Sequence, residues 1–166
     1  MKIVERLNKF KNRPRAIRPY RVVLHHTAGG TILGAESALK SRGLGYHYMI
    51  SKKGIIYEYV KPHRLCYHAY KNNMGTVGVA FIGGGKYGPA NQEQLRALGV
   101  LLEVMKDEYP SIREITGHKH IDPRGWKIDP HFAGEPVNGI DLDIDKKEMD
   151  RIARLSGLEF ISKRGK

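Results

Sequence analysis

Two histidine-rich stretches hold most of the residues that could do chemistry. Residues 115–132 read ITGHKHIDPRGWKIDPHF and contain three of the eight histidines and the only tryptophan. Residues 22–30 read VVLHHTAGG, an apolar run that ends in two adjacent histidines and small residues. Catalytic zinc takes three protein ligands and leaves one position for a water whose pKa falls to about 7. Together the stretches predict a metal site closed by long-range folding.

We predict His25, His118 and Asp129 as the ligands of that site. His25 ends a predicted strand and faces a glycine-rich loop, His118 follows a strand and a glycine, and Asp129 supplies a carboxylate. The HExxH helix motif is absent, so the site must be assembled from separate strands and loops. Alternatives stay open at each position: the adjacent His26, the nearby His120, and the Asp122 of an identical Asp-Pro step.

A lysine is predicted to lie beside the metal. If residues 127–129 are extended, Lys127 and Asp129 point to the same side of the chain. An ammonium there suits a reaction in which an amide oxygen gains negative charge. The same alternation places Tyr46 and Tyr48 on one face of their strand and His47 on the other.

The pattern of apolar residues predicts an α/β fold: one domain in which a central mixed sheet is flanked by helices. Capping boxes at Asn91 with Gln94, and at Asp145 with Glu148, would open two of the helices. The second of these would bury Met149, Ile152 and Leu155, and a basic tail would follow from Ser162. Strands are expected over residues 22–24, 46–51, 55–60, 77–82 and 112–116, helices over 35–41, 91–109 and from 145, and a strand or loop over 64–68.

Residues 1–20 are predicted to form a basic arm ahead of a domain at residues 21–166. The first 21 residues hold eight Lys and Arg against Glu5 alone, with Ile3, Val4, Leu7 and Phe10 at helical spacing up to Pro14. Such a helix would either dock on an anionic lipid surface or pack its apolar stripe on the domain. Both interpretations stay open.

Composition bounds the class of protein. At 166 residues and 40% apolar residues, one ordinary core is expected, and no window approaches the roughly 18 apolar residues of a membrane span. Cys66 is the only cysteine, which excludes an intramolecular disulfide framework. No signal peptide is recognised, so synthesis in a reducing cytoplasm is expected. The net charge of +12 would attract nucleic acid, an anionic membrane face or bacterial wall polymer, or would simply aid solubility.

Four stretches in order carry a family resemblance: VVLHHTAGG, GYHYMISKKGIIYEYV, YHAYKNNMGTVGVAFIGGG and ITGHKHIDPRGWKIDP. Together they resemble the zinc-dependent N-acetylmuramoyl-L-alanine amidases, the group of phage lysozyme-type amidases and peptidoglycan recognition proteins. The resemblance covers about residues 20–132. It implies zinc at the floor of the sheet and cleavage of the amide that joins N-acetylmuramic acid to L-alanine in peptidoglycan.

The resemblance also implies roles for single residues. His25, His118 and Asp129 would hold Zn²⁺, Tyr46 would orient or deprotonate the water, and Lys127 would stabilise the oxyanion. His68 would line the substrate groove. Two features depart from the family pattern. The third ligand is often cysteine in the phage and recognition branches, and the strand VGVAFIGG lacks a glutamate that some bacterial relatives use.

A phage endolysin is the expected biological role: a monomer made in the host cytoplasm that acts on the cell wall after release. Its partners would be peptidoglycan and, through the basic arm, the anionic outer-membrane surface. Two other functions remain open. A noncatalytic recognition module would bind wall material without cleaving it. A metal-dependent nuclease is disfavoured, and no nucleic-acid partner is expected, because no dense acidic cluster that would hold Mg²⁺ lies near the histidines.

Overall fold

A computed structural model describes residues 2–137 and 141–162 of the chain. In this part of the chain a seven-stranded sheet has the order β1-β5-β4-β7-β3-β8-β9, and a separate antiparallel pair is formed by β2 and β6. Both parallel and antiparallel neighbours occur in the large sheet, so it is mixed. The strands are β1 (Ile3–Glu5), β2 (Asn12–Pro14), β3 (Arg21–His26), β4 (Tyr48–Ile50), β5 (Ile56–Glu58), β6 (Arg64–Cys66), β7 (Thr76–Phe81), β8 (Glu114–Gly117) and β9 (Glu159–Phe160).

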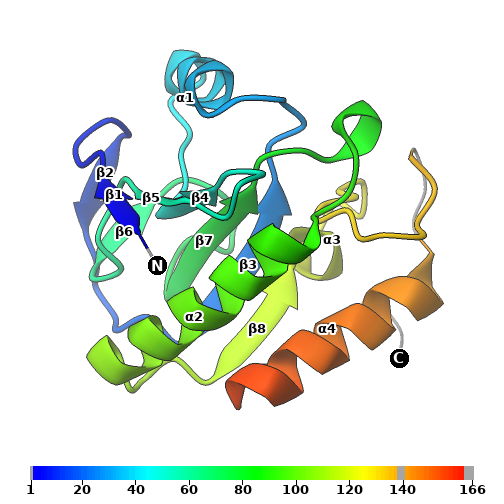
Figure 1. The fold of residues 1–166 in the computed structure, drawn as a ribbon. Helices are drawn as coiled ribbons and strands as arrows, with labels where there is room; N and C mark the ends of the chain where they lie inside the picture. Colours follow the sequence, from blue (N-terminus) through cyan, green and yellow to red (C-terminus); the bar gives the residue numbers. More distant parts are fainter. Residues whose placement is uncertain (1, 138–140, 163–166) are drawn as a thin grey trace.

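Helices cover the sheet on both sides. Figure 1 shows α2 (Gln92–Glu108) and α4 (Leu142–Ser156) crossing one face, and the turned views place β2, β6 and the short α3 (His118–Ile121) on the other. Helix α1 (Ile32–Ser41) lies apart from this pair, and η1 (Gly85–Tyr87) is a 3-10 turn. The expected single-domain α/β fold is confirmed. In the described residues no helix is both long and apolar enough to span a membrane.

The core explains why the two faces of β3 differ. Val22 and Leu24 are fully buried in the main core, which includes Leu98 of α2 and Met149 of α4. Val23 points the other way and packs with residues of the opposite face. Because side chains alternate along a strand, His25 shares the face of Val23, away from α2 and α4. His25 therefore lies on the same face of the sheet as α3.

The N-terminal segment is not a helix, so that prediction is wrong. Strand β1 pairs in parallel with β5, and β2 pairs with β6. Phe10 is only 3% exposed, and Arg15 donates hydrogen bonds to the carbonyl oxygens of Arg64 and Thr76 at 2.8 and 2.9 Å. Burial lowers the pKa of Arg15 to about 10. Backbone pairing and the insertion of these two side chains outweigh the weak helical spacing.

Two expectations for the last helix are also wrong. Its N-cap is Asp141, whose side chain accepts hydrogen bonds from the backbone of Asp143 and Ile144. Asp145 is fully buried inside the helix, so it is no cap. Leu155 is 73% exposed and lies off the buried face, whereas Met149 and Ile152 are buried as expected. The capping box of α2 at Asn91 and Gln94 is confirmed. The predicted basic tail lies outside the described residues except for Ser162.

Candidate metal centre

The two candidate histidines are brought together by strand register. Strands β3 and β8 pair in parallel, with Leu24 opposite Gly117. The next residue after Leu24 is His25 of β3, and the next after Gly117 is His118, the first residue of α3. Their ring centroids lie 4.6 Å apart. Gly117 is required here, because a Cβ at this position would lie 2.9 Å from Cδ of Pro130. The histidine pair is thus a direct product of the sheet.

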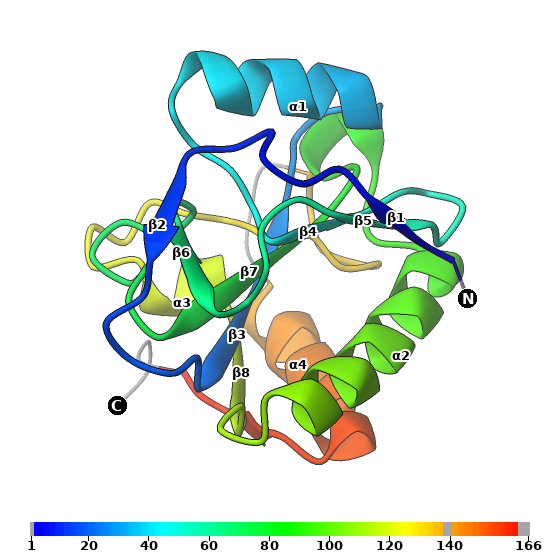
Figure 2. The ribbon, with the colours of Figure 1, turned by 90° about the vertical axis from the view of Figure 1, so that its left-hand side faces the viewer.

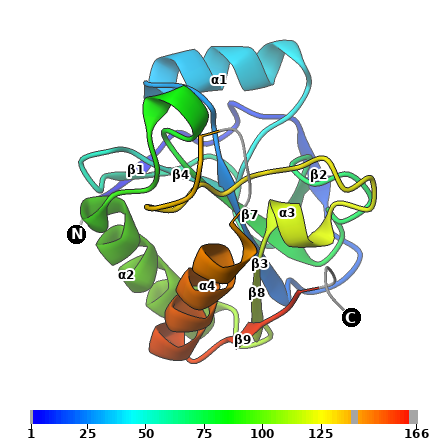
Figure 3. The same ribbon diagram turned by 90° about the vertical axis from the view of Figure 1, so that its right-hand side faces the viewer.

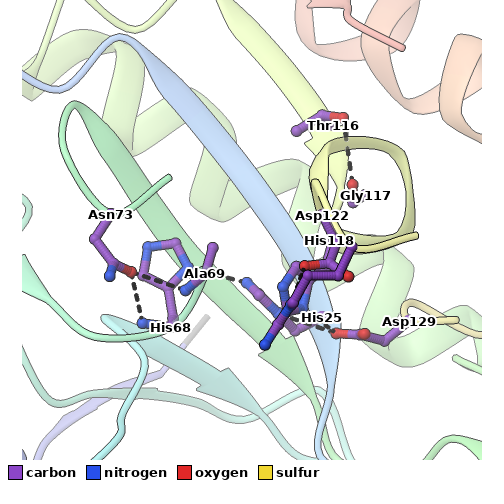
Figure 4. A network of polar contacts seen from close by, with 10 residues as sticks. His25, His68, Ala69, Asn73, Thr116, Gly117, His118, Asp122 and Asp129 are labelled. Atoms are coloured by element: carbon purple, nitrogen blue, oxygen red, sulfur yellow. Dashed lines mark hydrogen bonds and ion pairs between the residues drawn. The ribbon is translucent and has the colours of Figure 1, made fainter. Parts of the chain in front are cut away.

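The third candidate ligand reaches the same point from the loop after α3. The Asp129 Oδ2 atom lies 3.0 Å from His25 Nδ1 and 3.2 Å from His118 Nδ1. One ligand atom of each of the three residues lies within 4.8 Å of the others, and all three side chains are buried. Figure 4 shows His25 between Asp129 and His68. The structure therefore places the three predicted ligands in one cluster.

The protonation states suit a metal site. Burial, reinforced by the charge on His118, lowers the pKa of His25 to about 4, so its imidazole is neutral near pH 7. Burial alone would raise the pKa of Asp129, but hydrogen bonds from His118 and His25 outweigh it and hold that pKa well below its usual value. Neutral imidazole and carboxylate are ligands that catalytic zinc uses. His118 Nε2 is also buried without a hydrogen-bond partner in the described structure. The donor set fits zinc.

The predicted catalytic side chains lie around a pocket of about 330 Å³ next to this cluster. The Tyr46 ring lies 4.8 Å from the His25 ring, and both Tyr46 and Lys127 line the pocket with Asp129. Burial, with the charge of Asp129 adding to it, raises the pKa of the Tyr46 hydroxyl. The phenol therefore stays protonated and can donate a hydrogen bond, which favours orienting over deprotonating a water.

His68 lines the same pocket and also supports His25 from behind. Its Nδ1 lies 3.0 Å from His25 Nε2, and its Nε2 lies 3.2 Å from the Thr76 hydroxyl. An outer partner of this kind fixes the ring orientation of a metal ligand. Gly78 makes the arrangement possible, because a Cβ there would lie 2.6 Å from the His68 ring. Contact of His68 with substrate stays a prediction. The structure adds a second role, in which His68 holds the His25 ring in position.

Two residues in this arrangement were missed from the sequence. Asn73 Oδ1 accepts hydrogen bonds from the backbone N–H groups of His68 and Ala69, both at 2.8 Å, and Thr76 contacts the His68 ring. Figure 4 shows Asn73 holding this turn. The signal was present in the run KNNMGT, because asparagine side chains often bind nearby backbone groups in turns. Asn72, Asn73 and Thr76, which follow His68 within eight residues, could have indicated side chains that hold the His68 turn in place.

The alternative ligands lie elsewhere. The His120 ring pairs with Asp145 of α4, and Asp122 accepts a hydrogen bond from Arg124 at 3.0 Å. His26 is directed towards Gly84 and has the ring of His131 6.5 Å away. In the part of the chain that the structure describes, the cluster of possible ligand atoms comprises His25, His118 and Asp129 alone.

A buried lysine ties the cluster to the last helix. The Lys119 ammonium lies 2.8 Å from Glu135 and 2.9 Å from Asp145, and these side chains are at most 1% exposed. Glu135 in turn accepts a hydrogen bond from the backbone of Phe132, while the backbone N–H of Lys119 donates to the carbonyl of Asp129 at 2.9 Å. One residue therefore joins α3, the loop that carries Asp129, and α4.

Comparison with known proteins agrees with this geometry. Residues 15–132 match the family described as N-acetylmuramoyl-L-alanine amidase. The chain belongs to this family. Peptidoglycan-recognition protein SD of Drosophila simulans and of Drosophila melanogaster is 32% identical over 117 residues, which cover 61% of this chain. The match spans 63% of the length of those recognition proteins. The predicted family is thus confirmed.

Solved structures show the same amidase fold. The amidase LysC from Clostridium intestinale is 24% identical and has a TM-score of 0.62, over 90% of this chain and 98% of that one. The Ph2119 endolysin of a Thermus scotoductus bacteriophage is 22% identical with a TM-score of 0.63, over 95% and 100% of the two chains. The crystal structure of Drosophila recognition protein SD is 26% identical, with a TM-score of 0.60 over 74% and 85%.

The adjacent histidines His25 and His26 provide a matched test of the metal centre. We expect His25→Ala to lower zinc affinity by at least about 100-fold, because loss of an outer partner already costs about 10- to 100-fold. His26→Ala should leave the affinity within about threefold, because its ring is outside the cluster. Titration calorimetry on folded protein measures both. Equal affinities for the two variants would contradict the assignment.

Lys119→Met should destabilise this amidase-family chain by about 3–5 kcal/mol, because it leaves the Glu135 carboxylate buried without its cation and removes one of the two basic groups that contact Asp145. Chemical denaturation followed by circular dichroism measures the free energy of unfolding. Lys53→Met is the control, since Lys53 is exposed, and should change stability by less than about 0.5 kcal/mol. If the two variants were equally stable, Lys119 would not be the structural link described above.

Proposed function

We propose that the protein is a zinc-dependent hydrolase that cleaves the amide between N-acetylmuramic acid and L-alanine in peptidoglycan. The observation that carries the proposal is the buried cluster of His25, His118 and Asp129 beside a pocket that also holds Lys127. Membership of the amidase family supports it. So does the likeness to recognition proteins whose name refers to the same polymer.

Each residue of the pocket has a part that its chemistry allows. The neutral imidazole of His25 and the ionised Asp129 would help to hold the ion. Zinc in such a site supplies Lewis-acid chemistry, polarising a carbonyl and lowering the pKa of water. Lys127 would place its ammonium where the amide oxygen gains negative charge. Tyr46, held protonated by burial, would orient the attacking water through a donated hydrogen bond.

The decisive assay is digestion of purified peptidoglycan, scored for newly exposed N-terminal alanine. The zinc-loaded protein should release it, a chelator should stop the release, and added zinc should restore it. Lys127→Ala should lower the rate by about 10²- to 10³-fold, as expected when one charge-stabilising donor is lost. Its zinc affinity should not change, because Lys127 is not in the ligand cluster.

Lys53→Ala, at an exposed turn, is the matched control and should digest at the parent rate. Release of alanine by Lys127→Ala at the parent rate would remove this residue from the mechanism. Binding of peptidoglycan without new alanine amines would identify a recognition module. Nicking of plasmid DNA would identify a nuclease.

We also propose an endolysin role, in which the protein is made in the host cytoplasm and reaches the wall after release. The charge of +12 supports attraction to anionic wall polymer and to the anionic outer-membrane surface. Part of this charge lies on exposed side chains of the N-terminal segment, including Lys9, Arg13 and Arg18. Deletion of the segment is unsuitable as a test, because Phe10 and Arg15 are part of the fold.

Neutralising only the exposed charges tests the membrane contact. The triple variant Lys9→Gln, Arg13→Gln and Arg18→Gln should kill intact Gram-negative cells less well, since each basic residue near an anionic surface contributes about 1 kcal/mol. Its activity on purified wall should be unchanged. Survival counts and wall digestion are the two measurements.

A control variant neutralises three exposed lysines outside the segment: Lys40, Lys53 and Lys146. The same loss of killing in both triple variants would show that total charge matters and the segment does not. An equal loss on intact cells and purified wall would reject a membrane role for the segment.

A further inference from the structure

Three side chains form an exposed stack beside the metal pocket. The guanidinium carbon of Arg124 lies 4.5 Å from the ring centroid of Tyr70 and 4.5 Å from that of Trp126. Tyr70 comes from the turn after His68, and the other two come from the loop between α3 and Asp129. We call Tyr70, Arg124 and Trp126 the stacking platform. It joins the two loops that border the cluster.

Trp126 does not serve the core. It is 66% exposed, although it is the largest apolar side chain in the sequence and the only tryptophan. Tyr70 is also exposed, at 50%. Large aromatic surfaces left open to solvent next to a pocket are characteristic of binding sites. Trp126 is therefore not a core anchor.

The platform is held in place and its charge is balanced. Arg124 Nε donates a hydrogen bond to Asp122 Oδ1 at 3.0 Å, and the Asp122 side chain is fully buried. The cation of the platform is thus paired with a fixed carboxylate, which leaves a flat and largely neutral surface. Such a surface suits the apolar face of a ring better than it suits an anion.

The position of the platform connects it with the bond to be cleaved. Trp126 lines the same pocket as Lys127 and Asp129, and it directly precedes Lys127 in the chain. Another part of the pocket lining, residues 39–44, supplies Arg42. Arg42 is a group suited to the carboxylates of a peptide, whereas the platform offers flat aromatic surface. The two kinds of lining match the two halves of a sugar–peptide substrate.

We propose that the stacking platform binds the pyranose ring of an N-acetylated amino sugar on the glycan side of the scissile amide. The ring would lie against Trp126, with Arg124 and Tyr70 holding the indole in place. This inference rests on the proposed function and adds the subsite that selects the glycan. The protein would then recognise the sugar in addition to cleaving the amide bond.

The single tryptophan makes the proposal directly measurable, because all indole emission comes from position 126. The full chain is titrated with the disaccharide N-acetylglucosaminyl-N-acetylmuramic acid without peptide, and separately with the stem peptide without sugar. The disaccharide should change the emission saturably and the peptide should not. A change with the peptide alone, or an equal change with both, would overturn the proposal.

Variants measured by calorimetry give an independent readout. Trp126→Ala should weaken disaccharide binding by about tenfold, the loss expected when a central aromatic contact is truncated. Trp126→Phe should retain most of the binding, and zinc affinity should be unchanged in both. Leu155→Ala, which removes an exposed apolar side chain on α4, is the control and should bind normally. Equal binding by Trp126→Ala and the parent would overturn the platform.

The disaccharide lacks the amide to L-alanine that the proposed hydrolysis would cleave, so this test is separate from the amidase assay. Disaccharide binding without release of alanine would support sugar binding by the stacking platform and reject the proposed hydrolysis. Release of alanine without disaccharide binding at Trp126 would reject the platform and leave the hydrolase.

Discussion

The parallel pairing of β3 with β8 is the constraint on which the site depends. It sets Leu24 opposite Gly117, and this register delivers His25 and His118 as neighbours. A slip of one residue would turn one imidazole to the face that α2 and α4 cover, because side chains alternate along a strand. The same strand register therefore determines both the fold and the geometry of the candidate metal centre. Because Gly117 has no side chain, Pro130, the residue after Asp129, can pack closely against it.

The buried charges around Lys119 hold the Asp129 loop close to His25 and His118. A charged network inside a protein gains little net stability, since desolvation offsets much of the attraction. Its value here is geometric: Lys119 binds Asp145 of α4 and Glu135, and its backbone N–H holds the carbonyl of Asp129. A carboxylate on a loop would otherwise need many contacts to keep one position. The last helix thus contributes to the site although no ligand belongs to it.

The sequence predicted most of the elements and the clustering of His25, His118 and Asp129, but it missed the N-terminal strands and the buried charges. Strand β3 and its histidines were found because an apolar run with a polar end has one simple explanation. The N-terminal strands were missed, because the pairing that outweighs the helical spacing of Ile3 and Phe10 is made with residues far along the chain. Lys119 could not be recognised either, because lysine is almost never fully buried. Its partners, Glu135 and Asp145, come from distant segments.

As the predicted third ligand, Asp129 would have a chemical consequence for the site. An ionised carboxylate in that role would carry the same single negative charge as a cysteine thiolate. What changes is the redox chemistry, because a carboxylate is not oxidised whereas a thiolate is. The one thiol, Cys66, is fully buried, and burial raises its pKa to about 12. Cys66 is the only cysteine, so a reactive thiolate is expected neither at the candidate metal centre nor elsewhere in the chain.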